Sequence, residues 1–247
     1  MKKILDIIPV PLTPQLENST KDAYKIAKEL SDKTNNSFGM DIISINKGST
    51  SIEDAYDEAI NSPYILEKIK EIGSNYDAIV IDCFGDPGLD AAREITKVPV
   101  IGVNEASTHI ASQISSKFSI INILPETENL ILKILTKNGL LQSLASIVTI
   151  NIPVLSLEKE VDKTVESIIK GIEKAVKEDK AQAIVFGCTG MSFLLESVKE
   201  KLTQKGIEVP IIEPLRAGVY TAVSWILLDI AQSKLTYRPP RDKERIK

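Results

Sequence analysis

The sequence predicts an α/β protein with two pseudosymmetric lobes, each a four-stranded parallel sheet flanked by helices. Apolar runs of strand length alternate with stretches of helical periodicity along the chain. The runs are continuously apolar, as expected of parallel strands that helices cover on both faces. The alternation occurs twice, and in each half a cysteine follows the third strand and a Val-Pro pair opens the fourth.

In the first half, the periodicity predicts strands over residues 4–8, 40–45, 78–82 and 98–103, joined by helices over 20–32, 53–73 and 87–96. In the second half, it predicts strands over 118–124, 145–152, 183–186 and 209–212, with helices over 127–137, 162–178 and 191–205. A final helix over 216–232 is expected to pack back on the first lobe. We therefore expect an N-terminal lobe of residues 1–103 plus 214–247, a second lobe of residues 104–213, and an active site in the cleft between them.

The composition is that of an ordinary globular protein, with 43% apolar and 26% charged residues among 247. A net charge of −4 argues against a nucleic-acid partner, since phosphate binding needs a basic surface. The apolar runs are too short to span a membrane, and prolines interrupt the first one, which favours a strand over a signal peptide. We expect a cytoplasmic protein whose partner is a small-molecule substrate.

The two cysteines of the chain, Cys83 and Cys188, stand at corresponding strand ends. Open α/β sheets bind ligands at the carboxyl ends of their strands, so two facing lobes would bring both thiols to one cleft. Each cysteine precedes a predicted helix; after Cys83, Asp86 fits the N-cap and Pro87 the first helical position. Free N–H groups there are expected to lower the thiol pKa toward neutrality and to stabilise an enolate oxygen. Two such thiols suit removal of a proton from one face of a carbon and its return to the other.

Other interpretations of the polar residues are less favoured. A buried cysteine often acts as a small hydrophobe, but two at matching positions favour chemistry. A disulfide is not expected in a reducing compartment. A metal site is not expected, because His109 is the single histidine and no C-x-x-C pair occurs. His109 is predicted on a partly exposed helix face, and residues 51–54 predict a capping box rather than an anion site that includes residues 49–51. No nucleotide-binding loop motif occurs, so no cofactor is expected.

The segments DCFGDPGLDAARE and GCTGM, supported by SIEDAYDEA, VPVIGVNEAS, FSI, VPIIEP and SKLTYRPP, resemble the aspartate/glutamate/hydantoin racemase family. The hydantoin and allantoin racemase branch is the most similar. The resemblance implies two α/β lobes, cofactor-independent racemisation by two thiols, and a homo-oligomer. It also implies that Cys83 and Cys188 are the catalytic acid/bases, and that the substrate site is lined by Phe84, Gly85, Thr189 and Gly190.

Three positions differ within that family in ways that bear on the substrate. Glutamate racemases typically have a histidine where this chain has Gly190, which speaks against a free acidic amino acid. The hydantoin branch usually has asparagines where this chain has Ile8 and Val10. It commonly has paired threonines where this chain has Asn122 and Ile123, and Asn122 is expected to replace one of their substrate contacts. Racemase chemistry is therefore better supported than the hydantoin substrate.

We predict a racemase that inverts the α-carbon of a 5-substituted hydantoin or a related cyclic ureide or amino-acid derivative. One alternative is an aspartate-type racemase or a maleate-type cis–trans isomerase on the same scaffold, in which Arg216 would be a candidate to bind a carboxylate. Another is a non-catalytic binding protein, which the apolar Ile8 and Val10 would suit. Depressed thiol pKa values would favour an enzyme, and values near 8.5 or above would favour binding alone.

Overall fold

A computed structural model describes residues 1–244, and these fold into an α/β structure with two four-stranded parallel sheets. The first sheet has the order β2-β1-β3-β4, from β1 (Lys2–Ile8), β2 (Phe38–Ser44), β3 (Ala78–Ile81) and β4 (Val100–Gly102). The second has the order β6-β5-β7-β8, from β5 (Phe118–Asn122), β6 (Leu144–Thr149), β7 (Ala183–Phe186) and β8 (Ile211–Ile212). Because the two orders are equivalent and all neighbours pair in parallel, the predicted fold class is confirmed.

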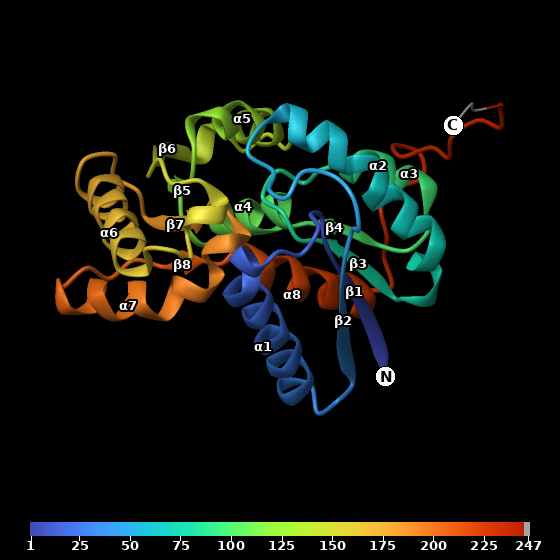
Figure 1. Ribbon diagram of the computed structural model, residues 1–247, viewed down its shortest axis with the longest axis horizontal. Coiled ribbons are helices and arrows are strands. Elements are labelled where there is room, and N and C mark those ends of the chain that lie inside the picture. Colours follow the sequence, from blue (N-terminus) through green and yellow to red (C-terminus); the bar gives the residue numbers. More distant parts are fainter. Residues whose placement is uncertain (245–247) are drawn as a thin grey trace.

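Helices cover the sheets in the way that the alternating pattern predicts (Figure 1). The first half contributes α1 (Glu17–Lys33), α2 (Ala55–Ile72) and α3 (Leu89–Ile95). The second half contributes α5 (Glu128–Lys137), α6 (Val161–Lys177) and α7 (Leu195–Gln204), the last preceded by the 3-10 helix η6 (Thr189–Leu194). Smaller 3-10 turns occur at Pro14–Leu16, Gly73–Asn75, Pro125–Thr127, Leu141–Ser143 and Val154–Ser156.

Two further helices, α4 (Val103–Ile114) and α8 (Pro214–Leu227), join the two halves. Helix α8 packs on β3 and β4 of the first sheet, α4 packs on β7 and β8 of the second, and the two helices contact each other. They approach closely at Gly218, where an added Cβ would lie 2.8 Å from Cγ1 of Val103. One apolar core includes side chains of both sheets and both helices. The division of the chain into two lobes with boundaries at residues 103 and 213 therefore stays a prediction.

Asp86 caps a different helix from the one that its position predicts. Its φ of 47° turns the chain, and α3 begins only at Leu89 without a side-chain cap. The Asp86 carboxylate instead accepts hydrogen bonds from the backbone N–H groups of Asn104 and Glu105, each 3.0 Å long, at the start of α4. The prediction for α3 is wrong because the partner lies on another element, which local sequence does not indicate.

Two predicted helix ends also differ from the structure. The capping box at residues 51–54 is wrong, because Asp54 caps α2 and accepts hydrogen bonds from the N–H groups of Tyr56 and Asp57, each 2.9 Å long. Helix α8 ends at Leu227 rather than at residue 232. Beyond it, Gln232 pairs with the edge of the first sheet, accepting from Val100 N at 3.1 Å and donating to Val98 O at 2.9 Å.

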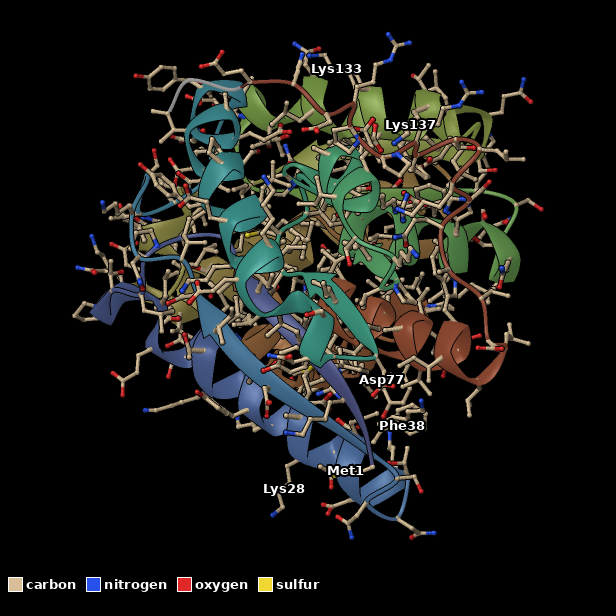
Figure 2. All side chains as sticks on the ribbon, turned by 90° about the vertical axis from the view of Figure 1, so that its right-hand side faces the viewer. Met1, Lys28, Phe38, Asp77, Lys133 and Lys137 are labelled. Carbon is tan, nitrogen blue, oxygen red and sulfur yellow. The ribbon has the colours of Figure 1, made fainter. Side chains whose placement is uncertain are left out.

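The strand directions determine where a ligand site can lie. Met1, Phe38 and Asp77, which stand at or just before the starts of β1, β2 and β3, lie close together at one end of the first sheet (Figure 2). The carboxyl ends of these parallel strands therefore meet at the opposite edge. Within residues 1–244, no helix is long and apolar enough to cross a membrane. The last three residues of the predicted N-terminal lobe, 245–247, lie outside the described part.

Candidate active site

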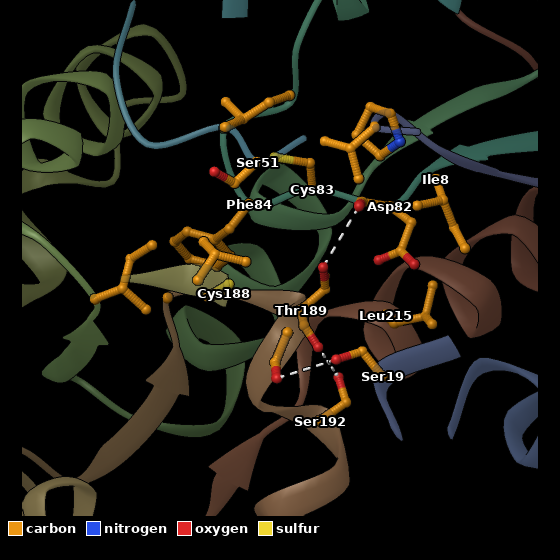
Figure 3. A pocket seen from close by; sticks show the side chains of 18 of the residues that line it. Ile8, Ser19, Ser51, Asp82, Cys83, Phe84, Cys188, Thr189, Ser192 and Leu215 are labelled. Carbon is orange, nitrogen blue, oxygen red and sulfur yellow. Dashed lines mark hydrogen bonds between the residues drawn. The ribbon is translucent and has the colours of Figure 1, made fainter. Parts of the chain in front are cut away.

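The carboxyl ends of β1, β3, β5 and β7 surround one pocket of about 90 Å³ (Figure 3). Strand ends contribute Ile8, Cys83, Ile123 and Cys188 to its wall. The remaining apolar side chains of the lining come from helices and loops of both halves: Pro9, Val10, Leu16, Ile52, Phe84, Leu130, Ile131, Val154 and Leu215. The pocket is thus at the edge of both sheets, where the topology places a ligand.

Six of the seven predicted site residues line this pocket: Cys83, Phe84, Gly85, Cys188, Thr189 and Gly190. The seventh, Asn122, does not. It is 0% exposed, and its amide donates to the Leu124 carbonyl at 2.6 Å and accepts from the Thr127 hydroxyl at 2.8 Å. Because these bonds hold the amide in the β5–α5 connection, the structure gives Asn122 a structural role and does not place it against a substrate.

Both thiols are free, and each stands beside backbone N–H groups. Burial nevertheless raises the pKa of Cys83 well above its usual range, although a hydrogen bond from the backbone of Gly85 opposes the shift. Burial also raises the pKa of Cys188 to about 12, against hydrogen bonds from the backbone of Gly190 and Met191. The predicted lowering of the thiol pKa values is therefore wrong, because desolvation outweighs the local donors.

Glycines beside Cys188 allow the chain to pack tightly around its sulfur. At Gly187, an added Cβ would lie 2.8 Å from the carbonyl oxygen of Ile121, and at Gly190 it would lie 3.3 Å from Sγ of Cys188. Side chains at these positions would displace β5 or cover the thiol. Close approach of the backbone thus accounts for the G-C-T-G segment.

Contacts between the halves enclose the pocket. The Thr189 hydroxyl donates to the carbonyl oxygen of Asp82 at 3.4 Å, which joins the end of β7 to the end of β3. The carboxylate of Glu53 accepts from Val154 N at 2.8 Å, and that of Glu158 accepts from Ser19 N at 2.9 Å. These bonds tie the loops after β2 and β6, and the start of α1, over the pocket.

A second group of polar residues at the site has no counterpart in the sequence predictions. Asp82 lines the pocket between β3 and Cys83, and it interacts electrostatically with the buried carboxyls of Asp6 and Glu213. Burial raises the pKa of Asp82 to about 7, and the negative charges of Glu213 and Asp22 act in the same direction. The signal in the sequence is an aspartate that ends an otherwise apolar strand directly before a cysteine.

The remaining candidates lie outside the pocket. His109 is a half-buried residue on α4, and its Nδ1 is 2.7 Å from the Glu105 carbonyl oxygen. The Ser49 hydroxyl donates to Asp57 at 2.6 Å. Arg216 pairs with Glu29 and its Nε lies 3.9 Å from Glu213. Within residues 1–244, no lysine, arginine or histidine lines the pocket, and no group of three histidine, cysteine or acidic side chains is arranged to hold a metal ion.

The fold, two equivalent parallel sheets with one pocket at their shared edge, is that of racemases, a group of isomerases. A sequence profile of the family described as Asp/Glu/Hydantoin racemase matches residues 17–222. The chain belongs to this family.

Individual relatives cover most of the chain. It is 36% identical over 206 residues to a hydantoin racemase of Pseudomonas sp. (strain NS671), covering 83% of this chain and 81% of that protein. It is 40% identical over 195 residues to a hydantoin racemase of Rhizobium meliloti, covering 78% and 79%. Among solved structures, an allantoin racemase from Klebsiella pneumoniae superposes with a TM-score of 0.87 at 33% identity, covering 100% of this chain and 97% of that one.

Proposed function

We propose that the protein is a cofactor-independent racemase of 5-substituted hydantoins or a related cyclic ureide, with Cys83 and Cys188 as its two acid/base groups. The observation that carries the proposal is the placement of both thiols, from equivalent ends of β3 and β7, in one enclosed pocket. The names of the relatives, hydantoin and allantoin racemase, support the substrate class.

The reaction balances with the two thiols alone. A thiolate removes the proton from the α-carbon, and the electron pair of the broken C–H bond moves into the neighbouring carbonyl group to give an enolate. The thiol on the other side then donates its proton to the opposite face of the same carbon. No electron is gained or lost, so the inversion needs only proton transfers. The raised thiol pKa values support this chemistry, because a thiolate that forms in the pocket is a stronger base than one in water.

The lining favours a neutral ring over a charged amino acid. A free amino acid brings a carboxylate and an ammonium group into the pocket, and a dicarboxylate brings two negative charges. In the described part of the chain, Asp82 and the two thiols are the titratable groups of the lining, and Arg216 is already paired with Glu29. Burying an unpaired charge in such a place is costly. This argues against the aspartate-type and maleate-type alternatives.

The test is α-proton exchange in D₂O, followed by NMR and optical rotation under reducing conditions. Single enantiomers of several 5-substituted hydantoins, allantoin, aspartate and glutamate are the substrates. We expect deuterium uptake with loss of optical activity on a hydantoin or allantoin. We expect Cys83→Ser and Cys188→Ser each to abolish racemisation, while the remaining thiol still exchanges the α-proton of one enantiomer. Full racemase activity in either variant would refute the two-thiol mechanism, and exchange on no substrate would favour a binding protein.

We also propose a homo-oligomeric state and a cytoplasmic location. The family resemblance supports the first, and two free thiols in the described chain suit a reducing compartment.

A further inference from the structure

Asp82 is the one carboxyl group of the described pocket lining, and one of its two oxygens has no partner there. Its side chain points away from Cys83 toward Leu215 and Thr189 at one side of the pocket (Figure 3). Its Oδ1 is buried without a hydrogen-bond partner in the described structure. A buried carboxyl oxygen without a partner costs stability, so a group supplied by the ligand is the simplest explanation for its retention.

The groups that face Asp82 are mostly acidic. Asp6 on β1, Asp22 on α1 and Glu213 at the start of α8 interact electrostatically with it, and so do the two thiols. Two cations lie near these carboxyls: Lys25 is 3.9 Å from Asp22, and Arg216, which is paired with Glu29, is 3.9 Å from Glu213. Burial, and then the charges of Glu213 and Asp22, favour the neutral form of Asp82, and together they outweigh a hydrogen bond from the Thr189 side chain that favours the charged form.

We propose that Asp82 binds the amide edge of the substrate ring as a neutral carboxylic acid, donating its O–H to the carbonyl oxygen next to the reacting carbon and accepting from the adjacent ring N–H. This inference rests on the proposed function, because it requires a substrate with a cyclic amide. A carboxylic acid carries a donor and an acceptor side by side, which matches the N–H and C=O of such an amide. Free amino acids lack this edge.

The same contact stabilises the intermediate. When a thiolate takes the α-proton, negative charge develops on the carbonyl oxygen, and the hydrogen bond from Asp82 strengthens. Asp82 keeps its proton throughout, so the proton balance of the two-thiol reaction is unchanged. An ionised Asp82 would instead repel the enolate. The raised pKa of Asp82, about 7, keeps a large neutral fraction near neutral pH.

The neutral acid has a distinctive pH dependence. The active form contains one thiolate and a protonated Asp82. Below about pH 7, Asp82 is mostly protonated and kcat/KM rises with pH because the thiolate fraction rises. That fraction is still rising throughout this range, because the thiol of Cys188 has a pKa of about 12. Above about pH 7, ionisation of Asp82 offsets the further gain in thiolate, so kcat/KM becomes level. A side chain that cannot ionise would remove that levelling.

The experiment compares Asp82→Asn, Asp82→Ala and Asp41→Asn with the wild type, by α-proton exchange on a 5-substituted hydantoin between about pH 5 and 8. Asparagine keeps a donor and an acceptor, so we expect Asp82→Asn to retain activity within about tenfold of wild type near neutral pH, and its kcat/KM to keep rising above pH 7. We expect Asp82→Ala to lose about 100-fold or more, as for removal of one oxyanion donor. Asp41, an exposed residue of β2, is the matched control, and its variant should keep the wild-type profile.

The outcomes separate this inference from the proposed function. Wild-type activity in Asp82→Ala would show that the contact is absent and overturn the inference alone. An equal loss in Asp82→Asn and Asp82→Ala at every pH would overturn it too, because it would indicate a carboxylate that acts as a base. A wild type that exchanges no hydantoin or allantoin proton would overturn the proposed function, and the inference with it. Thermal melts of each variant establish that losses do not reflect unfolding.

Discussion

Asp6→Leu is expected to stabilise the protein. Asp6 lies in the middle of β1, its side chain is 0% exposed, and neither carboxyl oxygen has a hydrogen-bond partner in the described structure. Leucine has nearly the same branched shape, so the packing against neighbouring strands is kept. A buried polar group without a partner costs about 1–3 kcal/mol. We therefore expect the free energy of unfolding to rise by about 2 kcal/mol at pH values where Asp6 is protonated in both states.

This gain should grow with pH. Burial raises the pKa of Asp6 well above its usual range, and the charges of Asp82 and Glu213 raise it further. An unfolded aspartate ionises near pH 4, roughly its ordinary pKa, whereas the folded protein keeps the proton. Stability contributed by a raised pKa is full below the unfolded value and is lost as the pH approaches the folded value. The wild type therefore loses up to about 1.4 kcal/mol of unfolding free energy per pH unit between about pH 4 and 7. Asp6→Leu has no such loss, because leucine does not ionise.

The assay is equilibrium urea unfolding at about pH 5, 6 and 7, followed by Trp225 fluorescence and circular dichroism, with coincident transitions as the condition for a two-state treatment. Asp6→Asn is the matched control. It removes the titration but keeps a buried polar group, so it should flatten the pH dependence without the full gain in stability. If Asp6→Leu destabilises the protein at pH 7, or its effect is the same at all three pH values, Asp6 is ionised or has a partner in the folded state.

Two further predictions concern the Asp86 cap and the thiols. Gly102→Ala should lower the free energy of unfolding by about 1–2 kcal/mol or more, as for loss of a helix cap. The reason is that the added Cβ would lie 2.4 Å from Cγ of Asp86. A thermal melt unchanged from wild type would show that the Asp86 carboxylate can shift without losing its hydrogen bonds. Alkylation of Cys83 and Cys188 by iodoacetamide should be slow at neutral pH and should still accelerate at about pH 9, because burial raises both pKa values and only the thiolate reacts. A rate that levels near neutrality at either thiol would contradict the raised pKa there.

The raised thiol pKa values change how thiol reactivity bears on function. The sequence-based criterion takes values near 8.5 or above as a sign of a binding protein. Burial is the main cause of such values at both thiols in this structure, so this criterion does not separate an enzyme from a binding protein. Measured α-proton exchange is the decisive assay.

The sequence by itself determined the layout of the fold and the placement of the two thiols. Strand and helix periodicities are local properties, and a run such as residues 78–82 indicates a buried parallel strand without reference to other segments. Because parallel strands end at one edge of a sheet, the positions of Cys83 and Cys188 at matching strand ends also predicted a shared cleft. Both cysteines line the same pocket.

Only the tertiary structure decided the protonation of these groups and the partners of the polar ones. Asp86 caps a helix that begins 17 residues further along the chain at Val103, and Asn122 is held by its own connecting loop. Asp82 acquires its acidic surroundings from β1, α1 and α8. Burial and charge act through space, and they depend on segments that are distant in the sequence and adjacent only after folding. Local patterns therefore identify which residues end a strand, while the assembled fold determines their pKa values and what they bind.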